Sequence, residues 1–97
     1  MRREDYVFCI GFEGSTAIVD GKLQRRFYSY ATRQLAEQGM FKQALCSAVW
    51  GGKPEELEEV LSIFNQKTKA PVRTVEELSR IFGVSVVPEG VKKVTTI

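Results

Sequence analysis

The sequence contains no histidine, and this absence removes several kinds of chemistry from consideration. A Ser-His-Asp or Cys-His arrangement needs an imidazole to accept and return a proton near neutral pH. A pH switch that works through histidine is excluded for the same reason. Catalysis can still use carboxylates, lysine or tyrosine, so the composition makes an enzyme less expected without excluding one.

Cysteine is also scarce, since Cys9 and Cys46 are the only two and no Cys-x-x-Cys pair occurs. Zinc sites are usually built from Cys and His, so two separated cysteines do not supply a common ligand set. Each lies in an apolar run, where a free cysteine behaves as a small buried hydrophobic residue. We therefore expect reduced structural thiols and no cofactor. The alternatives are a disulfide and a reactive thiol.

Long hydrophobic runs are missing as well. No stretch approaches the roughly 20 apolar residues that are needed to cross a bilayer. Arg2 and Arg3 precede a short apolar run, as they would in a signal peptide. Acidic residues at positions 4 and 5 interrupt the basic start, however, and no small-residue cleavage site follows. We therefore expect a cytoplasmic protein with no membrane partner.

The residues that are present give the composition of an ordinary globular protein, with 43% hydrophobic and 27% charged residues. Fourteen Lys and Arg against twelve Asp and Glu leave a net charge of only +2. A charge so small does not by itself indicate a nucleic-acid or membrane partner. The length of 97 residues is typical of one domain, and we expect residues 1–97 to form a single α+β domain.

The first segment with a clear pattern is Tyr6–Phe12, which is aromatic and β-branched and predicts a strand. Because this strand is apolar on both faces, with Tyr6, Phe8, Ile10 and Phe12 on one of them, we expect it at the centre of a sheet. The turn residues 13–15 lead into a second strand, Thr16–Val19, and predict an antiparallel hairpin. The next turn, Asp20-Gly21, either ends the hairpin or leads into a further strand over Leu23–Tyr28.

The middle of the chain predicts helices. Helix-forming residues extend from Ser29 to Trp50 and are interrupted at Gly39, which suits the left-handed end of a helix. Gly51-Gly52 ends this region, and a further helix begins at Pro54. Its apolar stripe consists of Leu57, Val60, Leu61 and Phe64. Residues Asn65–Pro71 are interpreted as a loop.

A fourth, short helix is predicted to begin at Thr74, which with Glu77 forms a capping-box pattern, and to end at Gly83. Its expected buried side chains are Val75, Leu78, Ile81 and Phe82. Residues 84–87 are strand-like, and residues 91–97 form a last strand or a tail. The order predicts an α+β fold: an N-terminal β-hairpin, three to four helices packed on one face of a small sheet, and one or more C-terminal strands.

Two short segments resemble known families. Residues 74–85 resemble the first helix and turn of a helix-turn-helix unit, which implies a DNA-recognition helix directly after Ser85. A strand and turn pattern with Pro88 and Gly90 follows instead, so we favour a simple capped helix. Residues 38–44 are similar to the Gly-x-aromatic-x-x-Ala core of a tetratricopeptide repeat, but only one partial copy is present. Neither resemblance predicts a function for the chain.

The strongest candidate for a contact surface is the segment 22–33, which contains both basic and aromatic residues and no acidic one. Basic side chains contact phosphates and aromatic rings stack on unpaired bases, so this composition suits a single-strand binder. The simpler interpretation is a solvated edge whose aromatics face the core. Trp50 is added as a candidate for a protein interface, because Trp and Tyr are enriched there. The candidate contact residues are Lys22, Arg25, Arg26, Tyr28, Tyr30, Arg33 and Trp50.

Two further candidate sites lie around the helix that is predicted to begin at Pro54. Residues 51–54 open a helix, where anions can bind, but they lack the spacing of a P-loop. The glutamates that follow could form a catalytic or metal-binding carboxylate pair. Because the apolar stripe fixes the buried side of the helix, we expect these carboxylates to point into water. They are Glu55, Glu56, Glu58 and Glu59.

The leading hypothesis is a small non-catalytic protein that acts through protein–protein contacts as a homodimer. It depends on the expectation of a small sheet with open edges, because pairing edges across a two-fold axis is a common way to cover them. The alternative is a nucleic-acid-binding protein that uses the segment 22–33. A second alternative is a small-molecule-binding protein or a carboxylate-based enzyme.

Overall fold

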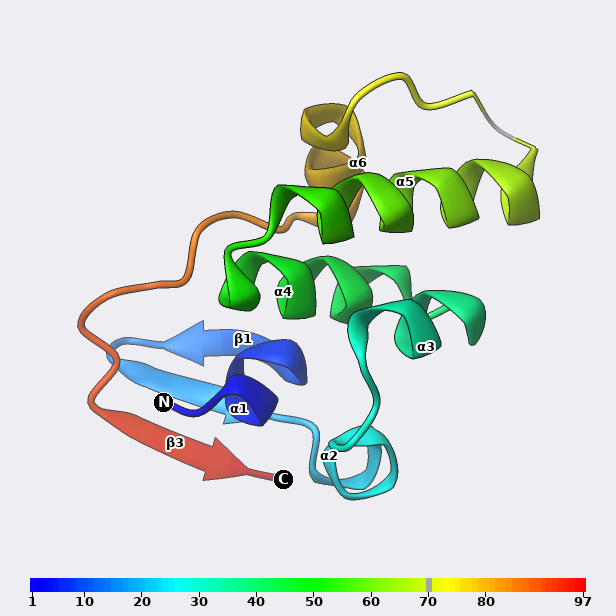
Figure 1. Cartoon of the computed structure of the whole chain (residues 1–97). Coiled ribbons are helices and arrows are strands. Elements are labelled where there is room, and N and C mark those ends of the chain that lie inside the picture. The colour runs from blue at the N-terminus through cyan, green and yellow to red at the C-terminus, as the bar shows by residue number, and fades with distance from the viewer. Residues whose placement is uncertain (70) are drawn as a thin grey trace.

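The elements follow one another along the chain in the order of the colours in Figure 1. The structure is a computed structural model, and it describes residues 1–69 and 71–97. Within these residues there are six helices and three strands. The helices are α1 (Arg3–Val7), α2 (Gly21–Phe27), α3 (Thr32–Glu37), α4 (Phe41–Gly51), α5 (Pro54–Thr68) and α6 (Val75–Phe82). The strands are β1 (Cys9–Glu13), β2 (Thr16–Val19) and β3 (Lys93–Thr96).

The strands form a mixed sheet in the order β1-β2-β3. β1 and β2 make an antiparallel hairpin, and β3 lies parallel to β2 on its other side. The chain between β2 and β3 contains the helices α2 to α6. α1 lies against the strands and packs in turn against α4 (Figure 1). The expected α+β fold is therefore confirmed, with an N-terminal hairpin, helices and a C-terminal strand.

The predicted central strand over Tyr6–Phe12 is wrong in its start and in its position. Residues Arg3–Val7 form α1, and the strand begins only at Cys9. β1 lies at the edge of the sheet, whereas β2 is central. Val7 and Phe8 are nevertheless almost fully buried, because the short helix turns them into the core. The apolar character of this segment therefore reflects burial in the core and not a central strand.

β1 also departs from a regular strand by one bulge. The paired positions are Cys9 with Val19, Gly11 with Ile18 and Phe12 with Ala17. Ile10 is therefore an extra residue without a partner across the hairpin. The bulge turns Cys9 and Phe12 to the same face and leaves Ile10 53% exposed. The face predicted from alternate residues, with Ile10 beside Phe12, is wrong for this reason.

Asp20 ends the hairpin and begins α2. Its Oδ1 accepts hydrogen bonds of 3.1 Å from the backbone N–H groups of Lys22 and Leu23. An aspartate in this position satisfies N–H groups that have no partner within the helix. The alternative prediction of a further strand over Leu23–Tyr28 is therefore wrong, and the turn is followed by a helix.

The two helices predicted between Ser29 and Trp50 are α3 and α4. They are separated at Gly39, which has a φ of 80°, and α4 ends at Gly52, which has a φ of 66°. Both residues adopt the left-handed conformation that glycine tolerates best. Pro54 occupies the first turn of α5 as predicted.

α5 extends beyond its predicted end. The loop predicted over Asn65–Pro71 is wrong for residues 65–68, which are helical, and residue 70 lies outside the described residues. The helix ends at Lys69, which adopts a left-handed φ of 55°, so no glycine marks this end. The amide of Asn65 then fixes the following segment, because it exchanges hydrogen bonds of 2.9 and 3.1 Å with the backbone of Val72.

α6 begins where Thr74 Oγ1 accepts a hydrogen bond of 3.2 Å from the Glu77 N–H, and it ends at Gly83, as predicted. The other half of the predicted capping box is wrong, because the Glu77 carboxylate accepts a hydrogen bond of 3.3 Å from the N–H of Arg73 and not from that of Thr74. Its buried side is narrower than expected, since Leu78 is fully buried but Ile81 is 59% exposed. The strand predicted over 84–87 is wrong, because this segment has no neighbouring strand. The segment after it does contain a strand, β3.

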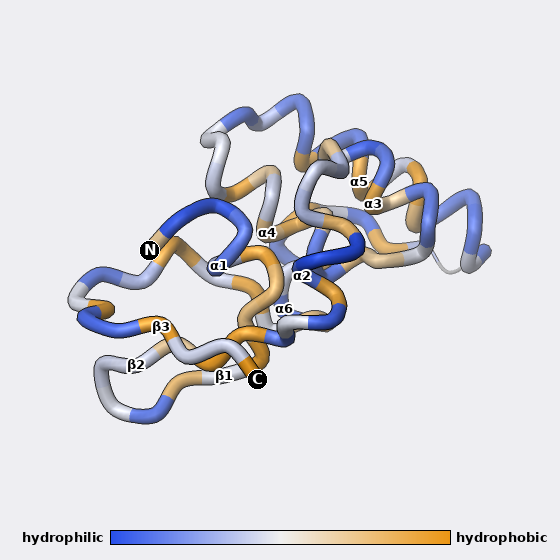
Figure 2. The backbone as a smooth tube through the Cα atoms, turned by 90° about the horizontal axis from the view of Figure 1, so that it is seen from below, coloured by the Kyte–Doolittle hydropathy of each residue, from blue (hydrophilic) through white to orange (hydrophobic). Residues whose placement is uncertain are grey.

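α4 is the central helix and packs against α1, α3, α5 and α6. Figure 2 shows the strands at one end of the molecule and α3 and α5 towards the other, with α4 between them. The ring of Phe41 on α4 packs against those of Phe64 and Phe82, with centroids 5.0 and 6.2 Å apart. α4 therefore joins the end that contains the sheet to the end that contains the last helices.

Candidate functional site

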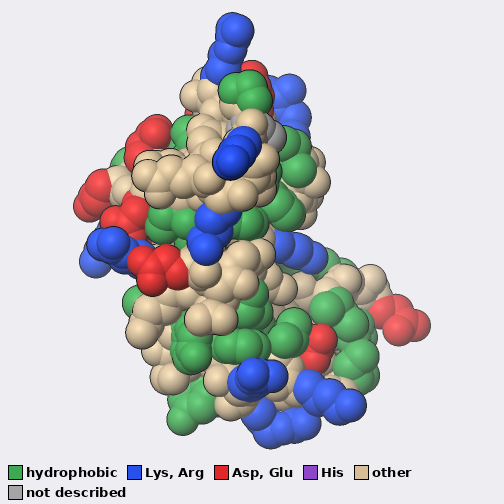
Figure 3. Space-filling model, turned by 90° about the vertical axis from the view of Figure 1, so that its right-hand side faces the viewer, with side chains coloured by type: hydrophobic (Ala, Val, Ile, Leu, Met, Phe, Trp, Pro, Cys, Tyr) green, Lys and Arg blue, Asp and Glu red, His purple; other side chains and the backbone are tan. Residues whose placement is uncertain are grey.

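The basic part of the segment 22–33 lies mainly on α2. Lys22, Arg25 and Arg26 are exposed there, and none of them forms an ion pair with any carboxylate of residues 1–69 and 71–97. Figure 3 shows basic side chains gathered at this lower end of the molecule. These three side chains are therefore available to contact a negatively charged partner.

The aromatic residues of this segment are less available. The rings of Phe27 and Tyr30 pack edge to face with centroids 5.0 Å apart, and the guanidinium of Arg26 lies 5.1 Å from the Phe27 ring centroid. Tyr28 is 59% exposed. Arg33 lies apart on α3, where it forms an ion pair of 2.8 Å with Glu37. The segment therefore offers one open ring and not the row of rings that stacking on successive bases uses.

Trp50 lies near the end of α4 and is half-buried. Its ring packs against that of Tyr6, with centroids 5.9 Å apart. Together with Tyr30 it lines a shallow hollow of about 310 Å³. Arg3 also lines this hollow, and its guanidinium donates hydrogen bonds to the carbonyl of Tyr30 (2.7 Å) and the hydroxyl of Ser47 (2.8 Å). The structure thus brings two candidate residues together, around an arginine that joins α1 to α4.

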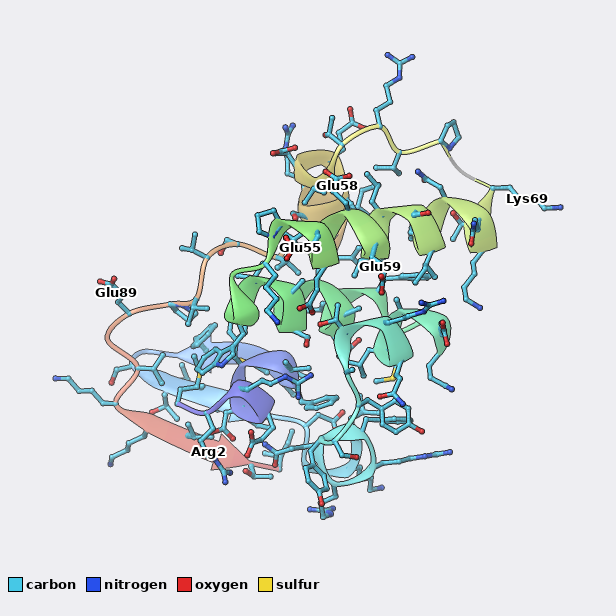
Figure 4. The ribbon with its side chains drawn as sticks, viewed as in Figure 1. Arg2, Glu55, Glu58, Glu59, Lys69 and Glu89 are labelled. Carbon is cyan, nitrogen blue, oxygen red and sulfur yellow. The ribbon has the colours of Figure 1, made fainter. Side chains whose placement is uncertain are left out.

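The glutamates of α5 lie mostly in water, as the apolar stripe predicts. Glu55, Glu58 and Glu59 are exposed, and Figure 4 shows them projecting from the helix. Glu56 is half-buried and lies 3.9 Å from the Lys53 ammonium. In the described part of the chain, no three Cys, Asp, Glu or His side chains are grouped to hold a metal ion. These carboxylates therefore form an exposed acidic face.

The outer edge of β3 is a second surface that composition alone does not reveal. All four of its residues are exposed, and within the described residues no strand pairs with its outer side. Lys92 and Lys93 lie at its beginning. At its end, a Cβ placed on Gly21 would lie 2.7 Å from Thr96 Cγ2 and 3.1 Å from Arg25 Nη1. The Arg25 guanidinium therefore lies near the end of β3, and cations lie near both ends of this strand.

A pocket of about 270 Å³ lies beside β1. Residues from four parts of the chain line it: α1, β1, α4 and the segment that follows α6. They include Tyr6, Cys9, Phe12, Lys42, Cys46 and Val84. The two cysteines, which are distant in sequence, thus line one pocket. No local sequence signal predicts this site, because it forms only when α1 packs on α4.

The Tyr6 phenol on α1 and the Cys46 thiol on α4 are two of the polar side chains that line this pocket. The Tyr6 hydroxyl donates a hydrogen bond of 2.9 Å to the carbonyl oxygen of Ser85. Burial raises the pKa of the Cys46 thiol to about 11, although the nearby Lys42 ammonium acts in the opposite direction. Burial likewise raises the pKa of the Tyr6 phenol well above its usual value. Both groups therefore stay protonated and neutral near pH 7.

Comparison with protein-family models, curated proteins and solved structures finds no match for this chain. In the part of the chain that the structure describes, no helix is both long and apolar enough to span a membrane. Function is therefore argued from the surfaces and the pocket described above.

Proposed function

We propose that the protein is non-catalytic and acts by binding an extended, acidic segment of a partner protein along β3. The observation that carries the proposal is β3, whose four residues are exposed, whose outer side pairs with no described strand, and which has cations near both of its ends. Addition of a strand to an open sheet edge is a common way in which proteins bind extended peptides.

The backbone of β3 offers hydrogen-bonding groups at regular intervals. Lys93 and Ile97 donate their N–H groups to carbonyls on the β2 side, over 3.4 and 3.0 Å. Because the direction of these groups alternates along a strand, those of Val94 and Thr96 face away from β2. Neither a bulge nor a proline interrupts the strand. A partner strand can therefore pair along its full length.

The cations near both ends of β3 determine which charge a partner strand should carry. Lys92 and Lys93 at the beginning of β3, and Arg25 near its end, are exposed and form no ion pair with a described carboxylate. Like charges facing each other across strands are unfavourable, whereas opposite charges stabilise the pairing. Lysines on an edge strand also discourage pairing with unsuitable strands. An incoming strand with acidic residues near both ends fits this pattern best.

The same charges oppose the homodimer that open edges otherwise favour. Two-fold pairing of β3 with its copy would be antiparallel and would bring Lys92 and Lys93 of one protomer near Arg25 of its partner. The phosphates of a nucleic acid would pair with the cations, but they would form no strand hydrogen bonds with the outer side of β3. In the segment 22–33, one exposed ring, that of Tyr28, would be available for stacking on a base. The homodimer and the nucleic-acid interaction stay predictions that the following experiment separates.

The test uses a fluorescent peptide of alternating valine and threonine with glutamates at both ends, and a matched peptide with lysines in their place. Fluorescence anisotropy should show binding of the acidic peptide, weakened by salt, and none of the basic peptide. The double variant Lys93→Glu with Arg25→Glu should lower the affinity at least about fivefold and favour the basic peptide. Lys67→Glu on α5 is the control and should bind like the wild type.

Three results would overturn the proposal. One is equal binding of the acidic and basic peptides, and another is a loss with Lys67→Glu as large as with the double variant. The third is binding of a single-stranded oligonucleotide, but not of the acidic peptide, through the same cations. Light scattering of the unliganded protein measures the homodimer separately. A dimer that strengthens with salt would indicate that two β3 edges pair once their lysines are screened.

A further inference from the structure

We propose that the pocket beside β1 binds a small carboxylate with an apolar body, such as a medium-chain fatty acid. This site is separate from the edge of β3 and does not depend on the proposed function. It lies at the opposite edge of the sheet, because β1 and β3 are the two outer strands. No residue of the pocket belongs to β3.

The walls of the pocket suit an apolar body. Its apolar lining residues are Ile10 and Phe12 of β1 and Val84, Val86 and Pro88 from the segment that follows α6. Ile10, Phe12 and Val86 are all at least half exposed to water around the pocket, although they are large hydrophobic residues. A ligand that covers them removes apolar surface from water, which is the main favourable contribution in pockets of this kind.

One cation faces this apolar surface. Lys42 is the single charged residue among the described residues that line the pocket. It is half-buried, and no carboxylate within residues 1–69 and 71–97 lies within ion-pair distance of it. Lys42 also belongs to the first turn of α4, which contains no acidic residue. A cation is unfavourable near the positive end of a helix, so an anion bound beside Lys42 is favoured by both the ammonium and the helix.

The size of the pocket limits the ligand. Its volume of about 270 Å³ lies near the lower limit for small-molecule sites, so it suits a small acid better than a nucleotide. The neutral polar groups are compatible with such a ligand. Cys46 and Tyr6 stay protonated and add no negative charge that would repel a carboxylate. The pocket therefore has one charged end, next to α4, and an apolar remainder.

The first experiment compares three probes with one chain length and different head groups: octanoate, octanol and octylamine. Backbone amide shifts measured by NMR should move at Ile10, Phe12 and Val86 with octanoate, and octylamine should bind more weakly than octanol. Lys42→Met, which keeps the apolar stem, should weaken octanoate about tenfold or more and leave octanol unchanged. Lys67→Met on α5 is the matched control and should leave all three affinities unchanged.

The second experiment uses a thiol of the pocket as a reporter. In a Cys46→Ala background, the half-buried Cys9 is the only thiol, and saturating octanoate should slow its alkylation by iodoacetamide severalfold. Octylamine at the same concentration should not. If octanoate and octylamine bind equally, or if Lys42→Met leaves octanoate affinity unchanged, the proposal is wrong. Shifts confined to residues outside the pocket would also overturn it, and none of these results would bear on β3.

Discussion

The hydroxyl of Tyr6 donates a hydrogen bond of 2.9 Å to the carbonyl oxygen of Ser85 and so joins two segments that lie 79 positions apart. The ring of Tyr6 is buried between α1 and α4, where it packs against Trp50. Residues 84–87, which follow α6 directly, pair with no described strand. This hydrogen bond therefore ties that segment to the core and sets the position of one wall of the pocket beside β1.

Tyr6→Phe should lower the free energy of unfolding by about 1 kcal/mol, because it removes one hydrogen bond and keeps the buried ring. Urea denaturation followed by Trp50 fluorescence measures the change. Tyr28→Phe is the control, since Tyr28 is largely exposed, and it should leave the free energy within about 0.5 kcal/mol of the wild type. Equal effects of the two substitutions would show that the hydrogen bond to Ser85 adds nothing to stability.

Asp5 carries a buried negative charge that folding stabilises. Its Oδ2 accepts a hydrogen bond of 3.0 Å from the backbone N–H of Arg2, and its Oδ1 accepts one of 2.9 Å from the Gln24 amide. Burial alone would raise the pKa of Asp5, but the hydrogen bonds from Arg2 and Gln24 together outweigh it and lower the pKa below its usual value. The side chain thereby joins the beginning of α1 to α2.

Asp5→Asn should cost roughly 1.5–3 kcal/mol at pH 7, because a charged acceptor within a buried network is lost. Because the folded pKa is lower than the unfolded value of about 3.9, the ionised group stabilises the fold fully above that value. This contribution is lost as the pH falls through the folded pKa. Denaturation at pH 7 and at about pH 3 should therefore show a smaller difference between wild type and variant at the lower pH.

Glu37→Gln is the control for this pH dependence. Glu37 and its partner Arg33 are both exposed, and surface ion pairs contribute little. The substitution should change the free energy of unfolding by less than about 1 kcal/mol at either pH. A difference between wild type and Asp5→Asn that stays constant from pH 7 to pH 3 would contradict the role assigned to the Asp5 charge.

The features that could be predicted from sequence are those that neighbouring residues determine. Pro54 at the start of α5, the Thr74 cap of α6 and the left-handed Gly39 are each fixed by the chemistry of one turn. α1 could not be predicted in this way, because five residues are too few to show a helical period. The end of α5 cannot be predicted from a glycine, because a lysine, Lys69, takes the left-handed position where glycine is usual.

The candidate sites depend on contacts between distant residues, and this explains why they were predicted only in part. Composition identifies the cations of α2, since these charges are close in sequence. Nothing local indicates that Lys92 and Lys93 lie at the other end of the same edge, because β3 pairs with β2 in parallel after a long crossover. The pocket requires Cys9 and Cys46 to approach through the packing of α1 on α4. The same limit explains why the sequence does not show that Arg33, on α3, lies apart from the cations of α2.

Gly21→Ala should destabilise the protein and loosen β3. The added Cβ would lie 2.6 Å from the carbonyl oxygen of Ile97 and 2.7 Å from Thr96 Cγ2, so the end of β3 must move. Overpacking of this kind costs about 1–3 kcal/mol. Gly11→Ala is the control, because no atom lies within 4 Å of a Cβ at that position. Hydrogen exchange should show faster exchange in β3 for Gly21→Ala only; unchanged exchange would contradict the close contact.

Two proline substitutions test the direction of the backbone groups along β3. The backbone N–H groups of Val94 and Thr96, on either side of Thr95, face away from β2. Because the direction of these groups alternates along a strand, the N–H of Thr95 points towards β2. Thr95→Pro should therefore remove a ladder hydrogen bond between β3 and β2 and lower the free energy of unfolding. The N–H of Val94 faces away from β2, so Val94→Pro should cost clearly less, as proline is tolerated where the N–H of an edge strand faces solvent.

The variants Thr95→Pro and Val94→Pro also distinguish an effect on stability from an effect on peptide binding. Thermal unfolding should rank Thr95→Pro as the less stable variant, whereas Val94→Pro should stay folded and lose affinity for the acidic peptide. The loss follows because proline removes a donor that a partner strand would use. If Val94→Pro is folded and binds the acidic peptide as tightly as the wild type, the partner does not pair along β3. If it is the less stable of the two, the assigned direction of the backbone groups is reversed.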